Sequence, residues 1–509
     1  MAALLAVVAV VVTAGVLYLG RRGAEATEFS AARLVPADAP LFVGLDTDFT
    51  HPQWVAAFNH ARALGEADPE GRLRKLVLDE GNLDWERDVA PFLGGDAALY
   101  LRSIDIEAGL PGMAFIVRCA DVVRAQAVIE EQAGANLVTE RHEGVEYRTG
   151  LDGEGEEGFL ARLDDYLVIA TDRETLFAVM DVDAGRAPSL ADAPDYAKLR
   201  KELAPDLLIY SYMHAGRLAE MGMDALAGSG FALGQPGAGL TEAGAAAIGF
   251  TARTGAFELR SVGPPTTGAA AEPLAARTSR FVKLVPAGTM LFATTHGIDG
   301  SGLDSLGSLE DLGLGGGVDG PGGPLAGLDL PVAPDDLLAL LALTRGELAV
   351  AASADAGLDK PQAVLLAEVR DEAAARRLLD RIIPTAAGTR PRAQTVNGVP
   401  MYVVDSPLGE LAYAVTAGFF AVGTLDSVRS ALAPDRKLED SAAYQRALLE
   451  IDTSLGSYLY VDVQAVLQAF EEQLSPEGRT ASRAVRSLVI NAVQEGGVSR
   501  LIAALVVQE

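Results

Sequence analysis

The chain has 509 residues, of which 49% are hydrophobic and 22% charged, and its formal net charge at pH 7 is −29. The length predicts more than one domain, and the composition is typical of a folded protein rather than a disordered chain. The strong negative charge repels a phosphate backbone, so we expect no nucleic-acid partner.

The segment from Ala2 to Gly20 is apolar and carries no charge. As a helix it would extend about 28 Å, close to the thickness of a bilayer's hydrocarbon core. It also has no polar stripe of the kind that a surface helix shows. We therefore predict that residues 1–26 form a transmembrane anchor or a signal segment, although Ala24–Ala26 resembles a cleavage site.

A repeated phrase organises the rest of the chain. The sequence LVPADAPLFVGLD, which begins at Leu34, returns as LVPAGTMLFATTH at Leu284. Five further pairs follow in the same order, and a series of this kind predicts an internal duplication. We place the first copy at 27–262 and the second at 276–509, with a Gly- and Pro-rich linker at 263–275.

The first copy predicts a series of short strands and helices. A strand after the Pro-Ala phrase (PLFVGL) and a second strand (GDAALY) precede a third, AFIVR, which runs into a helix opened by Asp121. Aspartate suits this place because its carboxylate accepts hydrogen bonds from free backbone N–H groups. A strand near Val145, a hairpin turning at Asp164 and an amphipathic helix follow. A Tyr-x-Tyr strand at Tyr210 and a hairpin turning at Gly255 close the copy.

The second copy predicts the same series. The strands MLFATT, GELAVA and VLLAEV lead into a helix opened by Asp371, and a strand near Val399 and a hairpin at Thr416 follow. A strand at Tyr458 and a hairpin turning at Gly496 close it. Strands joined by hairpins and interrupted by helices predict an α+β fold. The predicted fold is therefore an N-terminal transmembrane helix followed by two duplicated domains with mainly antiparallel sheets and flanking helices.

Four features of the first copy resemble a known family: the Pro-Ala entry to its first strand, HPQW at His51, DWERDVAPFLGGDAALYL at Asp84 and LARLDDYLVIATDRETL at Leu160. They are similar to a bacterial family catalogued as domain of unknown function thirty-three fifty-two, over most of residues 30–509. The resemblance implies a membrane-anchored extracytoplasmic protein, but it assigns no chemical role to any residue. The second copy departs from the pattern because it has no Trp and lacks the acidic-aromatic phrase.

Location follows from the anchor and from this resemblance. Arg21 and Arg22 after the apolar segment would favour a cytoplasmic main domain under the positive-inside rule. Large acidic domains are nevertheless translocated, and the family implies the extracytoplasmic side. We expect a single-pass protein of the cell membrane whose main domain lies outside the cytoplasm.

The residue types that usually form catalytic, metal or cofactor sites are few and lie far apart in this sequence. No two histidines have zinc-ligand spacing, and we expect all five in loops or on the surface: His51, His60, His142, His214 and His296. The single Cys119 is expected to be an inert small residue. A G-x-G-x-x-G match at Gly315 has neither a strand before it nor a helix after it, so it predicts no dinucleotide site. We therefore expect no enzymatic activity, no cofactor and no metal.

A Gly-rich tract at 297–331 replaces, in the second copy, the segment that holds Trp54 and Phe58 in the first. Its leucines could form a flap over an apolar groove, although the simpler interpretation packs them and the two aromatic residues into the core. The candidate contacts to a ligand or partner are Trp54, Phe58, Leu303, Leu306, Leu309 and Leu312.

Three functional hypotheses remain open from the sequence. The first is a membrane-anchored, non-enzymatic module that binds a protein or lipid partner or holds envelope structure. The second is a carrier or sensor of a lipid or another apolar ligand, with a cavity between sheet and helices. The third is an enzyme whose site residues lie far apart in sequence.

Overall fold

We describe the protein from a computed structural model. The described residues are 29–79, 84–104, 111–133, 137–151, 157–221, 244–264, 278–299, 339–340, 342–353, 362–406, 409–451, 456–470, 474–495 and 497–508. None of the helices within these ranges is both long enough and apolar enough to cross a membrane. The predicted anchor at Ala2 to Gly20 and most of the Gly-rich tract lie outside the described residues.

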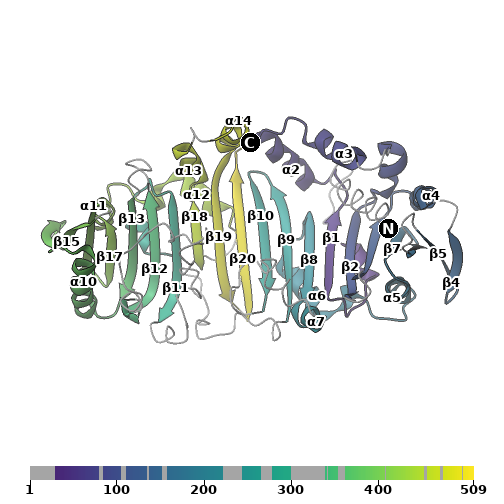
Figure 1. Cartoon of the computed structure of the whole chain (residues 1–509), viewed down its shortest axis with the longest axis horizontal. Coiled ribbons are helices and arrows are strands. Elements are labelled where there is room, and N and C mark those ends of the chain that lie inside the picture. The colour runs from purple at the N-terminus through teal and green to yellow at the C-terminus, as the bar shows by residue number, and fades with distance from the viewer. Residues whose placement is uncertain are drawn as a thin grey trace. The chain divides into compact units, whose positions relative to one another are not determined.

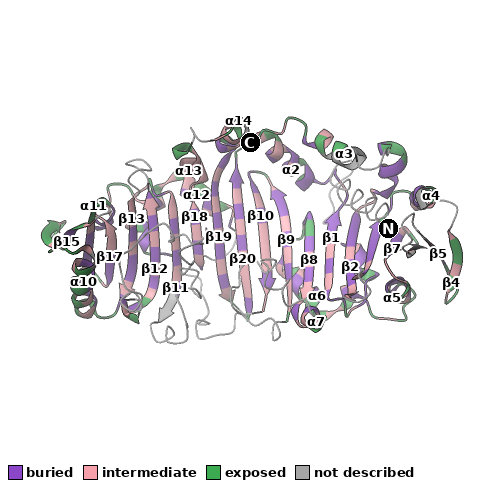
Figure 2. Ribbon diagram, in the orientation of Figure 1, coloured by how far each residue is buried: buried purple, intermediate pink, exposed green. Residues whose placement is uncertain are grey.

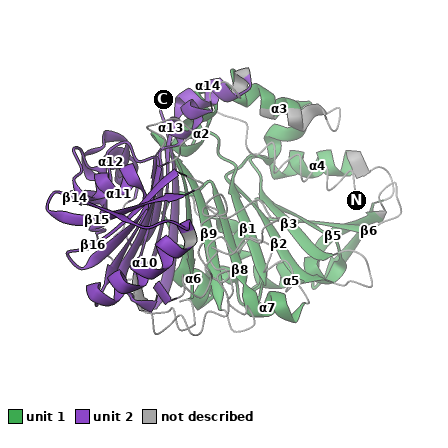
Figure 3. Cartoon of the chain, turned by 60° about the vertical axis from the view of Figure 1, so that its left-hand side comes forward, with its two compact units in different colours: residues 1–233, 239–264, 509 green, residues 234–238, 265–508 purple. Residues whose placement is uncertain are grey.

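The chain divides into two compact units (Figure 3). The first unit holds the described residues 29–264 and the second those of 278–508. Nearly all of the predicted linker at 263–275 lies outside the described residues, so the predicted domain boundaries stay a prediction.

The first unit contains an antiparallel sheet (Figure 1). Its described strands lie in the order β10-β9-β8-β1-β2-β3-β7-β6-β5-β4, and each neighbouring pair is antiparallel. The strands are β1 (Leu41–Asp46), β2 (Asp96–Ile104), β3 (Pro111–Arg118), β4 (Val138–His142), β5 (Val145–Leu151), β6 (Glu157–Leu163), β7 (Tyr166–Ala170), β8 (Ile209–His214), β9 (Ala245–Arg253) and β10 (Ala256–Gly263).

The second unit contains a sheet of the same kind. Its order is β20-β19-β18-β11-β12-β13-β17-β16-β15-β14, again with antiparallel neighbours. The strands are β11 (Leu291–Asp299), β12 (Thr344–Ser353), β13 (Gln362–Val369), β14 (Arg392–Val396), β15 (Val399–Ser406), β16 (Gly409–Thr416), β17 (Phe419–Thr424), β18 (Ser457–Val461), β19 (Val485–Glu495) and β20 (Val498–Val507). The strands that contain AFIVR and VLLAEV, β3 and β13, therefore occupy corresponding places in their sheets.

Helices cover both faces of the sheet in the first unit. They are α2 (Pro52–Ala63), α3 (Pro69–Asp79), α4 (Val122–Ala133), α5 (Arg173–Asp183), α6 (Pro194–Glu202) and α7 (Ala215–Glu220), with short turns η1 (Ser30–Arg33), η2 (Trp85–Val89), η3 (Ala90–Phe92) and η4 (Leu190–Asp192). Leu45, Ala97 and Val117 lie in one line across β1, β2 and β3 and belong to the clusters that pack under α2 and α4. Phe42 points to the opposite face, where its ring meets Tyr196 of α6. Figure 2 shows buried residues along the strands, with exposed ones on β4.

The second unit is covered in the same way. Its helices are α10 (Glu372–Ala387), α11 (Leu425–Leu432), α12 (Ala442–Leu449), α13 (Val463–Ala469) and α14 (Pro476–Ala484), with short turns η6 (Phe281–Lys283) and η8 (Leu438–Asp440). One core cluster joins α10 to β13, β15, β16 and β17, and another gathers residues of α11 and α12. Both units thus mix helices with antiparallel sheet, which confirms the predicted α+β fold class.

Local sequence explains the helix starts and the hairpin turns. Asp121 and Asp371 accept hydrogen bonds from backbone N–H groups three residues on, at 3.0 and 2.8 Å, as predicted for N-caps. The turn Asn397-Gly398 between β14 and β15 has positive φ at both residues, a conformation that asparagine and glycine adopt most readily. Ala417 and Gly418 turn the β16–β17 hairpin with φ values of 48° and 78°.

The repeated LVPA phrase has the same structural role in each unit. Pro36 forms an isolated antiparallel bridge with Ser189, just before α6, and Pro286 forms one with Lys437, just before α12. Each phrase thus joins the opening of its unit to a helix that follows more than a hundred residues later. This long-range role explains why the same phrase is needed twice.

A buried carboxylate fixes the short helix that opens the first unit. Asp96 of β2 is 2% exposed and accepts hydrogen bonds from the Ser30 hydroxyl and the Ala31 backbone N–H, both at 2.8 Å. Ser30 also shares a hydrogen bond of 2.5 Å with the Tyr166 hydroxyl. Desolvation raises the pKa of Asp96 even though both hydrogen bonds act to lower it.

The second unit holds its opening helix with a longer side chain. Glu347 of β12 is 3% exposed and accepts from the Ser279 hydroxyl, the Arg280 backbone N–H at 2.9 Å and the Thr294 hydroxyl at 2.8 Å. Both units therefore bury a carboxylate that satisfies donors at the start of η1 or η6.

Candidate functional site

The predicted contact residues of the first copy lie in its core. Trp54 and Phe58 of α2 are 6% and 8% exposed and pack with Phe49 in one cluster. The indole N–H of Trp54 donates to the Asp46 carbonyl oxygen at 3.2 Å. The four candidate leucines, Leu303, Leu306, Leu309 and Leu312, lie outside the described residues. Ligand contact by any of the six residues stays a prediction.

Three histidines are buried, which corrects the prediction that all five lie in loops or on the surface. His60 is fully buried, and His51 and His296 are each 6% exposed. A neutral imidazole can be buried when its ring packs and its N–H has an acceptor. The Nε2–H of His60 donates to the Arg253 carbonyl oxygen at 2.7 Å, and its ring meets Phe257 edge-on.

The described residues hold no cluster of three His, Cys, Asp or Glu side chains that could bind one metal ion. The Nε2–H of His142 instead donates to the Asp181 carboxylate, 2.9 Å away, and its ring stacks on Phe177. Cys119 is 6% exposed, and burial raises the pKa of its thiol to about 12. Thiolate is the reactive form of cysteine, so Cys119 lacks the character of a nucleophile.

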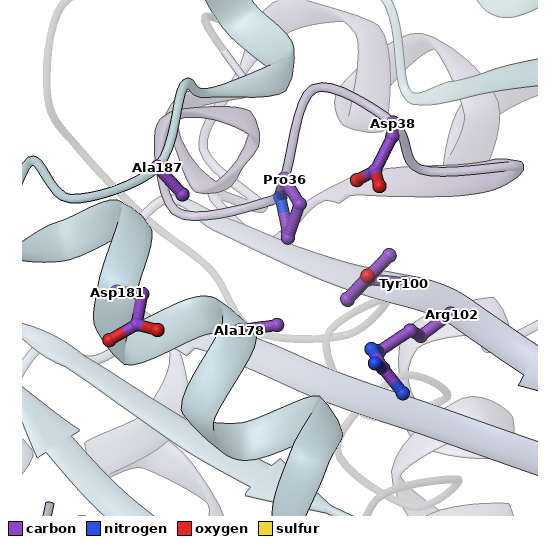
Figure 4. Close-up of a pocket in the computed structure, with 7 residues that line it drawn as sticks. All are labelled: Pro36, Asp38, Tyr100, Arg102, Ala178, Asp181 and Ala187. Carbon is purple, nitrogen blue, oxygen red and sulfur yellow. The ribbon is translucent and has the colours of Figure 1, made fainter.

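The first unit has a small polar concavity, which we call the β2–α5 pocket (Figure 4). Its volume is about 260 Å³. It is lined by Pro36, Asp38, Tyr100, Arg102, Ala178, Asp181 and Ala187. The pocket thus lies between β2, α5 and the chain around the first LVPA phrase.

Charges of both signs surround the β2–α5 pocket. Burial raises the pKa of Tyr100, and the nearby Asp38 carboxylate raises it further, so the hydroxyl keeps its proton. Burial also acts to raise the pKa of Asp181, but hydrogen bonds from His142 and Arg186 outweigh it and lower that pKa. Arg102 forms a surface ion pair of 3.1 Å with Glu174, whose side chain is 78% exposed.

A second and larger concavity, the η1–α6 groove, lies beside η1 and α6. Its volume is about 460 Å³, within the range of about 300–1,000 Å³ that is usual for small-molecule sites. It is lined by Phe29, Ser30, Ala32, Arg33, Ala191, Tyr196, Arg200, Lys201, Leu203 and Pro205. The β2–α5 pocket falls below that range, so the η1–α6 groove is the better candidate for a ligand of ordinary size.

Aromatic rings and one arginine shape the floor of the groove. Phe29 stacks on Tyr210 with ring centres 5.7 Å apart, and Tyr196 meets Tyr210 edge-on. The Arg200 guanidinium lies 6.0 Å from the centre of the Phe29 ring. It also donates to the carbonyl oxygens of Ala204 and Pro205 at 2.8 and 2.6 Å. These contacts fix Arg200 as part of the groove wall.

The charge of the groove is opposite to that of the chain. Its lining holds three cationic side chains, Arg33, Arg200 and Lys201, and among the described lining residues there is no carboxylate. Arg33 and Lys201 are exposed, whereas Phe29, Tyr196 and Leu203 are buried beneath. In a chain of net charge −29 such a grouping favours an anionic ligand with an apolar part.

The groove could not be predicted from the sequence, because its lining comes from two distant segments, 29–33 and 191–205. One signal was available: lysine is rare in this chain, yet Lys198 and Lys201 stand close together in KLRK. That phrase could have marked α6 as a cationic surface, but nothing local places Phe29 beside it.

Comparison with known proteins assigns the chain to a family but assigns no activity or ligand. The family model described as "Protein of unknown function (DUF3352)" matches residues 1–505, which confirms the resemblance predicted from the sequence. No curated protein matches the chain in sequence.

Crystal structures of a protein named TP0453 are weakly similar. Crystal forms IV, I and III show sequence identities of 12%, 11% and 9% and TM-scores of 0.26, 0.25 and 0.25. The matches cover 46%, 47% and 48% of this chain and 80%, 79% and 81% of the other. Likeness at this level carries no argument about function.

Proposed function

The chain belongs to the DUF3352 family, and for this member we propose a membrane-tethered, non-enzymatic binding module whose first unit takes an amphipathic anion in the η1–α6 groove. The observation that carries the proposal is the set of three cations over an apolar floor, with no carboxylate among the described lining residues. The anionic head would contact Arg33 and Lys201, and the apolar part would lie on Phe29, Tyr196 and Leu203.

The second unit supports this assignment by contrast. The segment DYAKLRKEL at Asp195 corresponds to AYQRALLEI at Ala443, so Leu448 and Leu449 stand where Arg200 and Lys201 stand in the first unit. Leu449 is 76% exposed. The same scaffold thus lacks two of the three cations in one unit, so the fold itself does not require them.

We infer that the two units arose by duplication. The inference is supported by the corresponding strand orders, by the two LVPA bridges and by the two buried carboxylates. After duplication, one copy could acquire a ligand groove while the other kept only the structural features.

The tether is a proposal from the sequence. We propose that Ala2 to Gly20 crosses the cell membrane once and that both units lie outside the cytoplasm. The nine residues from Arg21 to Phe29 span about 30 Å when extended, so the groove would lie near the lipid headgroups. Alkaline phosphatase fused after Glu509 should then be active, because that enzyme matures only outside the cytoplasm; an inactive but stable fusion would place the units inside.

Binding of three matched amphiphiles to the full chain in neutral-detergent micelles tests the groove. Palmitate should bind, whereas hexadecanol and hexadecylamine should bind more weakly because neither carries the negative head. Replacing Arg33 and Lys201 together by glutamine should weaken palmitate binding by about two- to thirtyfold, since each exposed ion pair contributes about 0.2–1 kcal/mol.

The control is Lys198→Gln, which removes an exposed cation of the same helix that does not line the groove. An equal loss of palmitate affinity in Lys198→Gln would show that the loss in the double variant comes from the net charge of the protein and not from the groove. Equal binding of palmitate and hexadecanol would contradict the proposal.

A further inference from the structure

The β2–α5 pocket shares no lining residue with the η1–α6 groove, so it can be considered independently. Tyr100 and Arg102 of β2 both line the pocket, and Arg102 lies at an irregularity in the pairing of β2 with β3, between Leu101 and Ser103. Figure 4 shows Tyr100 and Arg102 opposite Ala178 and Asp181 of α5, with Pro36 and Asp38 on the adjoining loop. The small side chains Pro36, Ala178 and Ala187 leave the space between these polar groups open.

Tyr100 brings a hydroxyl to this space. The residue is 2% exposed, but its hydroxyl is not among the enclosed, unpartnered polar atoms of the described residues. The hydroxyl therefore opens onto the pocket that Tyr100 lines. A ligand there can accept a hydrogen bond from it, because a neutral phenol can donate to a carboxylate.

The charges of the pocket select the ligand. Arg102 is positive and, among the described residues, pairs with the exposed Glu174, while Asp38 is exposed and negative. Asp181 is occupied by Arg186, at 2.6 Å, and by His142. An anion would meet Asp38 and a cation would meet Arg102, whereas a molecule with one charge of each sign can satisfy both.

We infer that the β2–α5 pocket binds a small zwitterion of the α-amino acid class. Its carboxylate contacts the Arg102 guanidinium and the Tyr100 hydroxyl, and its ammonium contacts the Asp38 carboxylate. The volume of about 260 Å³ suits a ligand of this size rather than a long chain.

The second unit serves as an internal comparison. The strand register pairs Tyr100 with Phe42 in the first unit and Ala351 with Phe292 in the second. Two residues further along β12, Ser353 takes the place of Arg102. The second unit therefore lacks both the hydroxyl and the guanidinium, and one ligand should bind to each full chain.

The test begins with saturation-transfer NMR of the full chain in micelles against a mixture of the standard L-amino acids. The amino acid with the strongest signal is then titrated by calorimetry beside its N-acetyl form, which lacks the ammonium, and its methyl ester, which lacks the carboxylate. We expect one site, and a loss of at least about tenfold for each derivative.

Variants connect each ligand charge to its partner. Arg102→Gln should weaken binding of the amino acid at least about tenfold but leave binding of the methyl ester, which has no carboxylate, unchanged. Asp38→Asn should also weaken binding of the amino acid at least about tenfold but leave binding of the N-acetyl form, which has no ammonium, unchanged. Glu174→Gln should not weaken binding, because it frees Arg102. Arg141→Gln, which removes an exposed arginine outside the pocket, is the matched control. Circular dichroism of each variant checks that it folds.

Three results would overturn the inference. The first is the absence of binding by any amino acid at about 10 mM, where even weak sites are occupied. The second is equal binding of the amino acid and both derivatives. The third is displacement of the amino acid by glucose, which would assign the pocket to neutral polyols.

Discussion

Replacing Asp96 by alanine should destabilise the first unit, because its carboxylate satisfies two donors at the start of η1. The Ala31 N–H and the Ser30 hydroxyl each donate to it at 2.8 Å, and Asp96 is 2% exposed. A buried donor that loses its acceptor costs about 1–3 kcal/mol. Ser30 can still donate to Tyr166, so we expect a total loss of about 2–4 kcal/mol.

Asp96→Asn should cost much less. The amide oxygen can accept from Ala31, and the amide N–H can donate to Ser30, whose own proton then turns to Tyr166. The difference in unfolding free energy between Asp96→Ala and Asp96→Asn therefore measures the contribution of the hydrogen bonds without that of the negative charge.

The pH dependence has a definite sign. Because burial raises the pKa of Asp96 in the folded unit, its contribution to stability is greatest below the usual pKa of 3.8 and decreases as the pH rises through the folded-state pKa. Asparagine does not titrate. The stability of Asp96→Asn relative to the parent should therefore be more favourable at pH 7 than at pH 4.

Tryptophan fluorescence in urea measures these changes directly. The chain has two tryptophans, Trp54 and Trp85, and both are buried in the first unit, so the signal reports that unit. Glu131→Ala, on the exposed surface of α4, is the control. Equal losses for Asp96→Ala and Asp96→Asn, or a loss below about 0.5 kcal/mol for alanine, would refute the reasoning.

Three further predictions concern other parts of the molecule. Cys119 should resist iodoacetamide at pH 8 in the native protein and react in urea, because burial raises the pKa of its thiol to about 12; native labelling at the unfolded rate would contradict this. Gly418→Ala should lower the stability of the second unit by about 1 kcal/mol and Ala417→Gly should raise it, as followed by circular dichroism, since both positions have positive φ. Palmitate affinity should decrease as salt rises from about 0.05 to 0.5 M, and a salt-independent affinity would exclude an ionic contact.

The strands and turns were predictable because their causes are local. A continuous run of apolar residues defines a strand such as β3, and Asp121 or Asp371 caps the helix that follows. The hairpin turns at Asp164 and Gly255 likewise depend on neighbouring residues. The doubled phrases added long-range information, since two copies of one series imply two similar units.

The candidate sites were not predictable, because they depend on contacts between distant segments. Phe29 meets Tyr210 across the first unit, and Tyr100 meets the chain at Asp38 only after β2 and β1 have paired. The burial of His60 was missed for the same reason, since its acceptor is the carbonyl of Arg253. Side chains of this kind become informative only when the sheet order is known.

Photocrosslinking tests the central proposal, that the η1–α6 groove binds an amphipathic anion, most directly. A palmitate analogue with a diazirine on its chain is bound to the full-length protein, irradiated, and the labelled peptides are identified by mass spectrometry. We expect label in peptides that contain 29–33 and 191–205, and we expect excess palmitate and the Arg33→Gln, Lys201→Gln double variant to reduce it. Label that is confined to other peptides, or that is unchanged in the double variant, would contradict it.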